Sequence, residues 1–301
     1  MALVNVQVMP NATPLSAAAA ALTVNGLPPI TPGSAVFLDF DGTLIELASQ
    51  PDAIVVPPEL PALLARLSAL LGGALALVSG RQLSELDHYL APLVLPTAAE
   101  HGAHCRMPTG SVIWSAAPDM HEVVRRVTLL ASQHLGLQAE IKTAAIALHY
   151  RHAPQLQDEC THVLQAIVAS TPGVELLHGK CVLEIKPAGT SKGTGIRAFM
   201  QHSPFAGRIP VFAGDDATDE TGFAVIHALD GYSLKVGSGV TLATLRCPAP
   251  VDVRNWLRHA CLSLEGAAQD YAPNDFNPLA GAMTVHGASD ANGANSAFVR
   301  V

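Results

Sequence analysis

Residues 37–44 read Phe-Leu-Asp-Phe-Asp-Gly-Thr-Leu, and they are the most informative residues of the chain. The apolar run 35–38 predicts a buried strand, which ends in two aspartates, Asp39 and Asp41, one residue apart. Ligands of a parallel sheet lie beyond the carboxyl ends of its strands, and alternation sends both aspartate side chains to the same side. Two close carboxylates repel each other and favour a cation, and Mg2+ prefers hard oxygen ligands. Taken alone, such a pair is more simply a polar turn after a core strand.

Three further motifs place polar residues where predicted strands end or a predicted helix begins. In chain order they are Ser79-Gly80-Arg81 after the apolar run 74–78, Lys192-Gly193 at a helix start, and Gly214-Asp215-Asp216-Ala217-Thr218-Asp219-Glu220 after the apolar run 209–213. Together with the DxDGT motif, this order resembles the haloacid dehalogenase (HAD) superfamily of phosphotransferases. The resemblance covers about residues 33–266.

Within that superfamily the chain most resembles the trehalose-6-phosphate phosphatases. The closer resemblance is carried by Gln50-Pro51-Asp52 through Val56-Pro57-Pro58-Glu59-Leu60, Val78-Ser79-Gly80-Arg81, Glu100-His101-Gly102, His149-Tyr150-Arg151 and the aspartate motif that starts at Gly214. It implies a Mg2+-dependent hydrolase of trehalose 6-phosphate in trehalose biosynthesis, which works through an aspartyl-phosphate. The alternatives are another capped sugar phosphatase, such as one acting on sucrose phosphate, and a catalytically silent regulatory module.

The composition is that of a globular protein. Of 301 residues, 49% are hydrophobic and 14% are charged, which suits a large core with one inserted domain. A net charge of −8, with 17 Lys and Arg and no basic run, excludes a nucleic-acid partner. The apolar segment 16–22 is too short to span a membrane. Five cysteines without a CxxC pair indicate reduced thiols in a cytoplasmic protein, and no obligate protein partner is expected.

Alternating strand and helix patterns predict a doubly wound, Rossmann-like parallel α/β sheet. Leucines at helical spacing predict a helix over 60–71, followed by strand 74–78, helix 82–90 and strand 93–95. The alternation resumes with strand 209–213, helix 218–229, strand 232–236 and a final helix at 251–265. Residues 31–104 and 187–266 are therefore predicted to form the catalytic core.

Residues 105–186 break this alternation and predict an inserted α+β cap domain, which the resemblance implies is of the C2 type. Its predicted elements are a strand at 111–114, a helix at 120–135, strands at 137–142 and 145–151, a helix at 156–169 and a strand pair across 174–185. Two linkers, near His104 and Pro187, would permit hinge motion. Residues 1–30 are predicted to be a flexible extension, and 267–301 a disordered tail.

The resemblance also assigns the catalytic roles. It implies that Asp39 is the nucleophile that forms an aspartyl-phosphate, and that Asp41 is the general acid and base. It implies that Ser79 binds a phosphoryl oxygen, although a serine after a strand is by itself more typical of a helix cap. Lys192 is implied to clamp phosphate and Asp39. We prefer it to Lys186 because Lys-Gly at a helix start matches the family pattern.

The predicted metal site is small, because Mg2+ keeps several waters and usually takes one or two protein carboxylates. We expect the side chains of Asp39 and Asp215 and the backbone carbonyl of Asp41 to be ligands. Asp216 would bind through water or orient the lysine. The run Thr218-Asp219-Glu220 is interpreted as an acidic helix start with a structural role.

His101 and His104 form a histidine pair at short ligand spacing near a motif. No cysteine pair supports zinc there. Surface or loop histidines are therefore the simpler interpretation of this pair.

Substrate-binding residues are predicted in both parts of the chain. In the core they are Gly42, Thr43, Gly80 and Arg81, with Thr43 open between a phosphate contact and a turn hydroxyl. In the cap they are Glu140, Lys142, Arg151, Lys180 and Glu184. Glu140 and Lys142 are two residues apart, and Lys180 and Glu184 are four apart. Each of these two pairs therefore lies on one face of a strand. A solvated face with cross-strand ion pairs is the alternative, whereas the resemblance implies that these groups bind the hydroxyls of a phosphorylated disaccharide.

Overall fold

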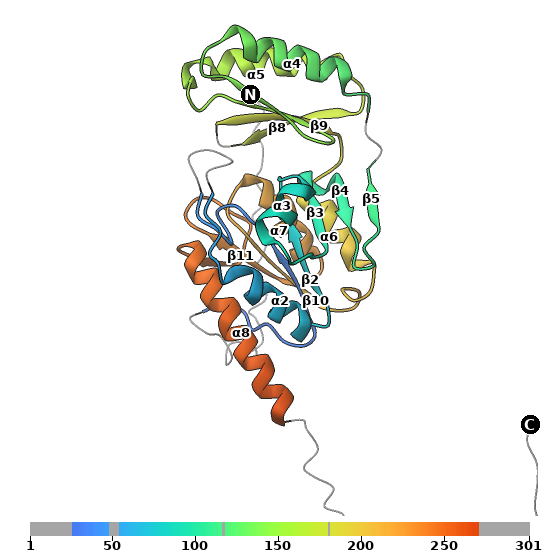
Figure 1. Ribbon diagram of the computed structural model, residues 1–301, viewed down its shortest axis with the longest axis vertical. Coiled ribbons are helices and arrows are strands. Elements are labelled where there is room, and N and C mark those ends of the chain that lie inside the picture. The colour runs from blue at the N-terminus through green and yellow to red at the C-terminus, as the bar shows by residue number, and fades with distance from the viewer. Residues whose placement is uncertain (1–25, 48–53, 116–117, 180, 271–301) are drawn as a thin grey trace, which may run out of the picture.

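The computed structural model describes residues 26–47, 54–115, 118–179 and 181–270. These residues form an eight-stranded sheet and a four-stranded sheet, and the smaller sheet lies above the larger one in Figure 1. Each sheet has its own cluster of buried apolar side chains. The protein therefore consists of a core and a smaller module between residues 118 and 187, named the cap.

Six parallel strands form most of the core sheet. Their order is β12 (Leu245–Cys247), β11 (Tyr232–Val236), β10 (Ile209–Gly214), β1 (Ser34–Leu38), β2 (Leu75–Val78) and β3 (Thr97–Ala99). Two antiparallel strands, β4 (His104–Arg106) and β5 (Val112–Trp114), extend the sheet beyond β3. All of β1 is buried, as expected for a central parallel strand covered on both faces.

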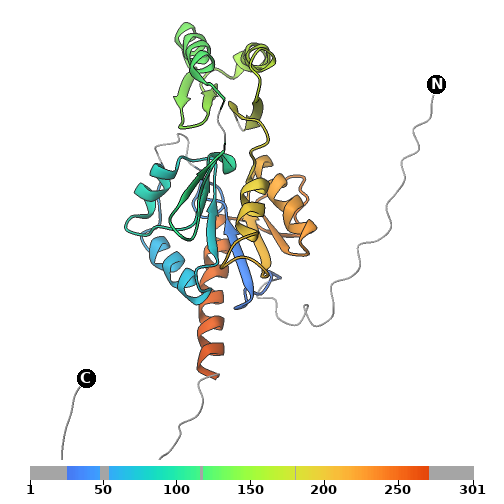
Figure 2. The same ribbon diagram turned by 90° about the vertical axis from the view of Figure 1, so that its right-hand side faces the viewer.

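Helices cover both faces of the core sheet, which confirms the doubly wound prediction. In Figure 2, α2 (Leu60–Leu70) and α3 (Leu83–Leu90) lie on one side, and α6 (Lys192–Met200) and α7 (Glu220–Ala228) lie on the other. The long α8 (Pro250–Asp270) packs against α2. Within the described part of the chain, no helix is long and apolar enough to cross a lipid bilayer.

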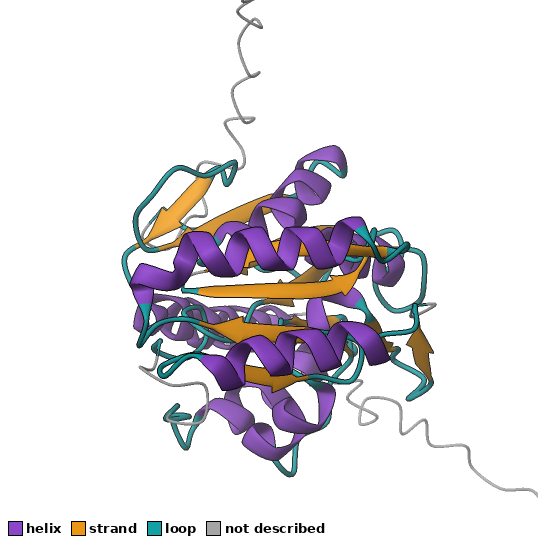
Figure 3. Cartoon of the chain, turned by 90° about the horizontal axis from the view of Figure 1, so that it is seen from above, coloured by secondary structure: helices purple, strands orange, loops and turns teal. Residues whose placement is uncertain are grey.

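The cap is an antiparallel sheet with two helices on one face. Its strand order is β6 (Gln138–Ile141), β7 (Ile146–His149), β9 (Val182–Pro187) and β8 (Val174–Gly179). The helices α4 (His121–Gln133) and α5 (Gln157–Ala169) lie over the strands in the view from above in Figure 3. Ile146, Leu148 and Ile185 are buried in the cap's own apolar cluster. The opposite face of the cap sheet is therefore turned toward the core.

Some predicted elements are placed differently in the structure. The strand predicted at 111–114 is β5, and it belongs to the core sheet rather than to the cap because it pairs with β4 in an antiparallel ladder. The strand predicted at 93–95 instead begins at Thr97. Strand β12 was not predicted, since three residues are too few to show a periodic pattern.

The predicted ends of the fold also need correction. Leu27 and Ile30 are buried, and the Pro28 carbonyl accepts a hydrogen bond from Trp256 Nε1 at 2.8 Å. Residues 27–30 are therefore part of the fold and not of a flexible extension. At the other end, α8 continues to Asp270. The rest of the predicted extension and tail lies outside the described residues.

Gly222 tests how closely α7 packs on the core sheet. A Cβ atom at this position would lie 2.4 Å from the Phe212 ring, so Gly222→Ala is expected to destabilise the fold by about 1–3 kcal/mol through overpacking. Gly266, an exposed residue of α8, is the matched control, because no atom lies within 4 Å of its Cβ position. Gly266→Ala is expected to add about 0.5–1 kcal/mol of helix stability. Urea unfolding of both variants measures this, and equal shifts would contradict the close packing.

Candidate active site

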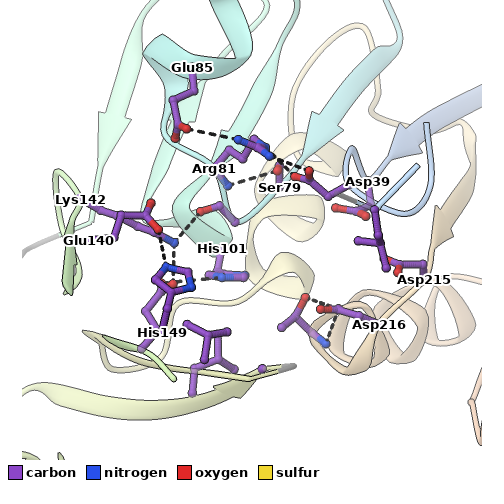
Figure 4. A pocket seen from close by; sticks show the side chains of 18 of the residues that line it. Asp39, Ser79, Arg81, Glu85, His101, Glu140, Lys142, His149, Asp215 and Asp216 are labelled. Atoms are coloured by element: carbon purple, nitrogen blue, oxygen red, sulfur yellow. Dashed lines mark hydrogen bonds and ion pairs between the residues drawn. The ribbon is translucent and has the colours of Figure 1, made fainter. Parts of the chain in front are cut away.

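A cavity of about 540 Å³ opens at the carboxyl ends of the core strands, on the side that faces the cap. The chain passes from β1 to β2 on one side of it and later returns to β10 on the other side. The strand order therefore reverses at β1, and ligands of such folds bind at the carboxyl ends of the strands at this switch point. Figure 4 shows Asp39 and Asp215 on the core side of this cavity, and Glu140 and His149 on the cap side. Residues that are far apart in the sequence therefore meet at one site.

Asp39 directly follows β1 and is only 3% exposed. Each of its carboxylate oxygens accepts a hydrogen bond, Oδ2 from Thr43 Oγ1 at 3.0 Å and Oδ1 from Lys192 Nζ at 2.7 Å. Burial raises the pKa of Asp39 to about 7, although Lys192 opposes the rise. The Thr43 hydroxyl thus orients Asp39 and is more than a simple turn hydroxyl, while the phosphate contact of Thr43 stays a prediction.

Lys192 lies between two buried carboxylates. Its Nζ donates to Asp39 Oδ1 and to Asp219 Oδ1, both at 2.7 Å. Burial would lower the pKa of Lys192, but Asp219 and Asp39 outweigh that effect and raise it. Asp219 is fully buried, so it does more than begin a helix, which was its predicted role. It positions the lysine.

Asp216 was expected to bind metal through water or to orient Lys192. In the structure its Oδ1 accepts hydrogen bonds from the backbone N–H and hydroxyl of Thr218, at 2.8 and 2.6 Å. Asp219 Oδ2 accepts the backbone N–H groups of Asp215 and Asp216, at 2.9 and 3.0 Å. Asp219 therefore shapes the turn after β10 as well as holding the lysine. The water-mediated role of Asp216 stays a prediction.

Three carboxylates are close enough to hold a cation. Oxygens of Asp39, Asp215 and Asp219 lie within 4.8 Å of one another. Asp219 accepts three hydrogen bonds, from Lys192 and two backbone amides, whereas Asp39 accepts two, so Asp39 and Asp215 are the better donors. Burial, together with Asp216 and Asp219, raises the pKa of Asp215 to about 7. Such crowded hard oxygen donors fit a divalent cation like Mg2+.

Gly42 allows this arrangement of carboxylates. Its φ is +74°, and a Cβ atom there would lie 2.2 Å from Asp215 Oδ2. Only glycine adopts this backbone conformation without strain and leaves room for the carboxylate. The glycine of the DxDGT motif is therefore required by the position of Asp215.

Asp41 lies outside the carboxylate cluster because Arg81 binds it. Arg81 donates from Nε to Asp41 Oδ2 at 2.6 Å and from Nη2 to Oδ1 at 2.8 Å, which is a bidentate ion pair. On its other side Arg81 contacts Glu85 at 3.3 Å, and its guanidinium lies 5.2 Å from the centroid of the Tyr89 ring. The predicted metal contact of Asp41 uses its backbone carbonyl and stays a prediction.

Ser79 and Gly80 line the cavity beside Asp39. Ser79 Oγ accepts the backbone N–H of Arg81 at 3.2 Å, and the Gly80 carbonyl accepts a hydrogen bond from Lys142 of the cap at 3.0 Å. A Cβ atom at Gly80 would lie 2.7 Å from the His101 ring. His101 is buried against this turn rather than exposed on a loop, and burial lowers its pKa, which keeps the imidazole neutral.

The cap face that meets the core carries paired charges. Glu140 and Glu184 stand in register across β6, β7 and β9, which places both side chains on one face of the sheet. His149 Nε2 lies 2.7 Å from Glu140 Oε2, and Lys142 Nζ donates to Glu184 Oε2 at 2.6 Å. Burial would raise the pKa of Glu184, but Lys142 and His101 outweigh it and hold the pKa at about 2.

Most predicted site residues reach this cavity. Those that line it are Asp39, Asp41, Ser79, Gly80, Arg81, Glu140, Lys142, Arg151, Glu184, Asp215 and Asp216. Behind its wall lie Gly42, against Asp215, and Thr43 and Lys192, which both bind Asp39. Lys180 lies outside the described residues.

Sequence reasoning missed three residues of the site. His101 and His149 line the cavity, and buried Asp219 binds the catalytic lysine candidate. All three stand inside motifs that carry the family resemblance, so the signal was present. Asp219 was assigned to a helix start, because an acid in the first turn of a helix is common for local reasons.

Comparison with known proteins identifies the family to which this chain is related. The Trehalose-phosphatase family model matches residues 37–245. The chain is 42% identical over 251 residues to trehalose-6-phosphate phosphatase of Escherichia coli strain K12, covering 83% of this chain and 94% of the relative. It is 43% identical over 208 residues to a probable trehalose-phosphate phosphatase of Sinorhizobium fredii, covering 68% and 78%.

Solved structures share the fold. A trehalose-6-phosphate phosphatase related protein matches with a TM-score of 0.63 and 26% identity, over 78% of this chain and 99% of that one. The C-terminal domain of C. albicans trehalose-6-phosphate phosphatase has a TM-score of 0.67 at 23% identity, over 76% and 91%. A HAD-superfamily phosphatase of Bacteroides thetaiotaomicron has a TM-score of 0.53 at 17% identity, over 75% and 94%. By its motifs, its fold and these relatives, the chain belongs to the trehalose-phosphatase family, whose members are phosphoric monoester hydrolases.

Proposed function

We propose that this chain hydrolyses trehalose 6-phosphate to trehalose and phosphate, as a step of trehalose biosynthesis. The observation that carries the proposal is a cavity with the buried Asp39 carboxylate on its core side and paired charges of the cap opposite. Its volume of about 540 Å³ lies in the range of small-molecule sites. The 42% identity to the Escherichia coli enzyme supports trehalose 6-phosphate as the substrate.

In the proposed first step, an Asp39 oxygen attacks phosphorus and the bond from phosphorus to the sugar oxygen breaks, which leaves an aspartyl-phosphate. Lys192 and Thr43 hold the attacking carboxylate. The departing sugar oxygen needs a proton, and Asp41 supplies it. Since Arg81 holds both carboxylate oxygens of Asp41 in this structure, Asp41 must turn from Arg81 toward the leaving oxygen to deliver that proton.

In the second step, water attacks the aspartyl-phosphate and Asp39 leaves as a carboxylate. Asp41 removes the proton from this water, so the same residue serves as acid and then as base. The Ser79 hydroxyl, the Lys192 ammonium and the amide of Thr43 bind phosphoryl oxygens, whereas the Gly42 amide already donates to the Ile45 carbonyl at 2.8 Å. When bound by Asp39, Asp215 and the Asp41 carbonyl, Mg2+ supplies charge neutralisation and polarises the phosphoryl group.

The cap is proposed to select the sugar. Its charged groups would bind hydroxyls of the disaccharide, namely Glu140, Lys142, Arg151, Lys180 and Glu184. A phosphatase of sucrose phosphate would share the core chemistry and differ only in these contacts. A silent regulatory module is the weaker alternative, since the chain retains Asp39, Asp41, Lys192 and Asp215 with their contacts.

Removal of metal tests the proposed Mg2+ site. Clustered carboxylates repel a dianionic phosphate, so exhaustive chelation is expected to abolish hydrolysis of trehalose 6-phosphate, and added Mg2+ to restore it. By titration calorimetry, Asp215→Asn is expected to weaken Mg2+ binding at least about ten-fold. The exposed Asp158→Asn on α5 is the charge-matched control and should bind like wild type. Full activity of the metal-free protein would contradict the proposed dependence on Mg2+.

Arg151 tests whether the cap reads the sugar. This residue lines the cavity yet is exposed, so Arg151→Ala should not unfold the protein. A hydrogen bond to a charged group is worth about 1.5–3 kcal/mol, so kcat/KM for trehalose 6-phosphate should fall at least about ten-fold relative to that for p-nitrophenyl phosphate. Arg125→Ala on the outer helix α4 is the control, because Arg125 pairs with Glu122 of the same helix.

A panel with trehalose 6-phosphate, sucrose phosphate, glucose 6-phosphate and p-nitrophenyl phosphate completes the experiment. Wild type is expected to prefer trehalose 6-phosphate by kcat/KM. A preference for another sugar phosphate would overturn the substrate assignment. If Arg151→Ala lowers kcat/KM equally for trehalose 6-phosphate and for p-nitrophenyl phosphate, this side chain does not select the sugar.

A further inference from the structure

Glu100 links the core to the cap through two hydrogen bonds. It follows β3 in the short helix η1 (Glu100–Gly102) and is 1% exposed. Its Oε2 accepts the backbone N–H of Ala144 at 2.8 Å, and its Oε1 accepts that of Thr143 at 3.3 Å. Both donors lie in the cap turn, residues 142–145, which joins β6 to β7. A buried carboxylate of the core therefore binds the backbone of a turn that belongs to the cap.

The cap turn contacts the core next to the phosphoryl site. Lys142 Nζ donates to the Gly80 carbonyl at 3.0 Å, and Thr143 Oγ1 donates to Gln82 Oε1 at 3.2 Å. Gly80 directly follows Ser79, which lines the cavity. Lys142 also pairs with Glu184 at 2.6 Å. The position of the cap turn therefore sets the positions of Lys142 and of its partner Glu184, which both line the cavity.

The local backbone of Glu100 is strained. Glu100 and His101 have φ angles of +46° and +55°, a left-handed conformation that non-glycine residues seldom adopt. Such strain persists only where the surroundings hold it, and it gathers at functional sites. On the core side, His104 Nδ1 lies 3.2 Å from Glu100 Oε1. The strained turn thus directs the Glu100 carboxylate toward the cap, and His104 contacts this carboxylate from the core side.

A buried carboxylate must be hydrogen-bonded. The two cap amides meet this requirement while the cap is closed, and water would meet it after the cap lifts away. The contact between Glu100 and the cap turn is therefore reversible. This is the property that a cap needs if it must admit a phosphorylated sugar and release the product.

We propose that Glu100 is a positioning residue that holds the cap closed over the active site. It does not line the cavity. It fixes the cap turn, and through that turn it places Lys142 and Glu184 over the cavity. This role rests on the proposed function, because it assumes that the closed cap reads the sugar and excludes water from Asp39.

Glu100→Gln tests the role with little change of shape. The amide NH2 group would face one of the two cap N–H groups, so at least one hydrogen bond is lost. In the ligand-free full-length protein, hydrogen exchange at the amides of Thr143 and Ala144 is expected to become at least about ten-fold faster. The ratio of kcat/KM for trehalose 6-phosphate to that for p-nitrophenyl phosphate is expected to fall about ten-fold.

Two further variants sharpen this experiment. Asp87→Asn is the matched control, because it removes a core carboxylate that pairs with Arg106 at 2.7 and 2.8 Å and does not line the cavity. It should leave both the exchange of the cap turn and the kinetic ratio unchanged. Glu100→Asp keeps the charge on a shorter side chain, and it should speed exchange of the cap turn even if Glu100→Gln fails to fold.

Unchanged exchange at Thr143 and Ala144 in both Glu100 variants would overturn the proposal. Equal kinetic losses on both substrates, together with a lower Tm, would also overturn it, since they would show that Glu100 supports the core alone. The exchange measurement needs no substrate. A wild-type protein that does not hydrolyse trehalose 6-phosphate would therefore overturn the proposed function and leave the contact between Glu100 and the cap turn standing.

Discussion

The ammonium group of Lys192 lies 2.7 Å from both Asp39 and Asp219, and the active site depends on this buried contact. The first turn of a helix disfavours a cation, so the start of α6 would not hold a lysine without these two carboxylates. Loss of one partner from a buried ion pair typically costs about 3–5 kcal/mol, because the remaining charge is left uncompensated. The contact ties together the end of β1, the turn after β10 and the start of α6. These three segments contribute the nucleophile candidate, the carboxylates suited to a metal, and the cation that holds them.

Chemistry and selectivity lie on opposite sides of the cavity. In the proposed mechanism the core provides Asp39 and its partners, which would act on any phosphoryl group, whereas the cap provides charges that are already paired with each other. Lys142 binds Glu184, and Glu140 binds His149. A bound sugar would have to replace the hydrogen bonds within these pairs. Only hydroxyls in matching positions would restore the hydrogen bonds that the charged groups give up. The Glu100 contact fits this division, because it controls where the cap side stands without entering the chemistry.

The sequence predicts the parts of the site that follow strands. Three motifs of the core stand where an apolar run ends, and parallel strands bring those ends to one edge, so the sequence alone places Asp39, Ser79 and Asp215 together. The role of Asp219 does not follow from such a pattern, because it depends on a lysine 27 residues earlier in the chain. The same holds for Glu100, whose partners lie 43 and 44 residues away in the cap turn. Strand β5 was misplaced since a three-residue run does not show which sheet it joins.

A covalent intermediate on Asp39 is the central chemical claim, and trapping it is the most direct test. Acid quench during turnover of trehalose 6-phosphate, followed by borohydride reduction, would convert an aspartyl-phosphate to homoserine that peptide mass spectrometry can locate. We expect the conversion at position 39. We expect more of it in Asp41→Asn turning over p-nitrophenyl phosphate, whose leaving group needs no proton and whose second step lacks its base. Conversion at another residue, or Asp39→Asn protein that hydrolyses trehalose 6-phosphate at the wild-type rate, would contradict the mechanism.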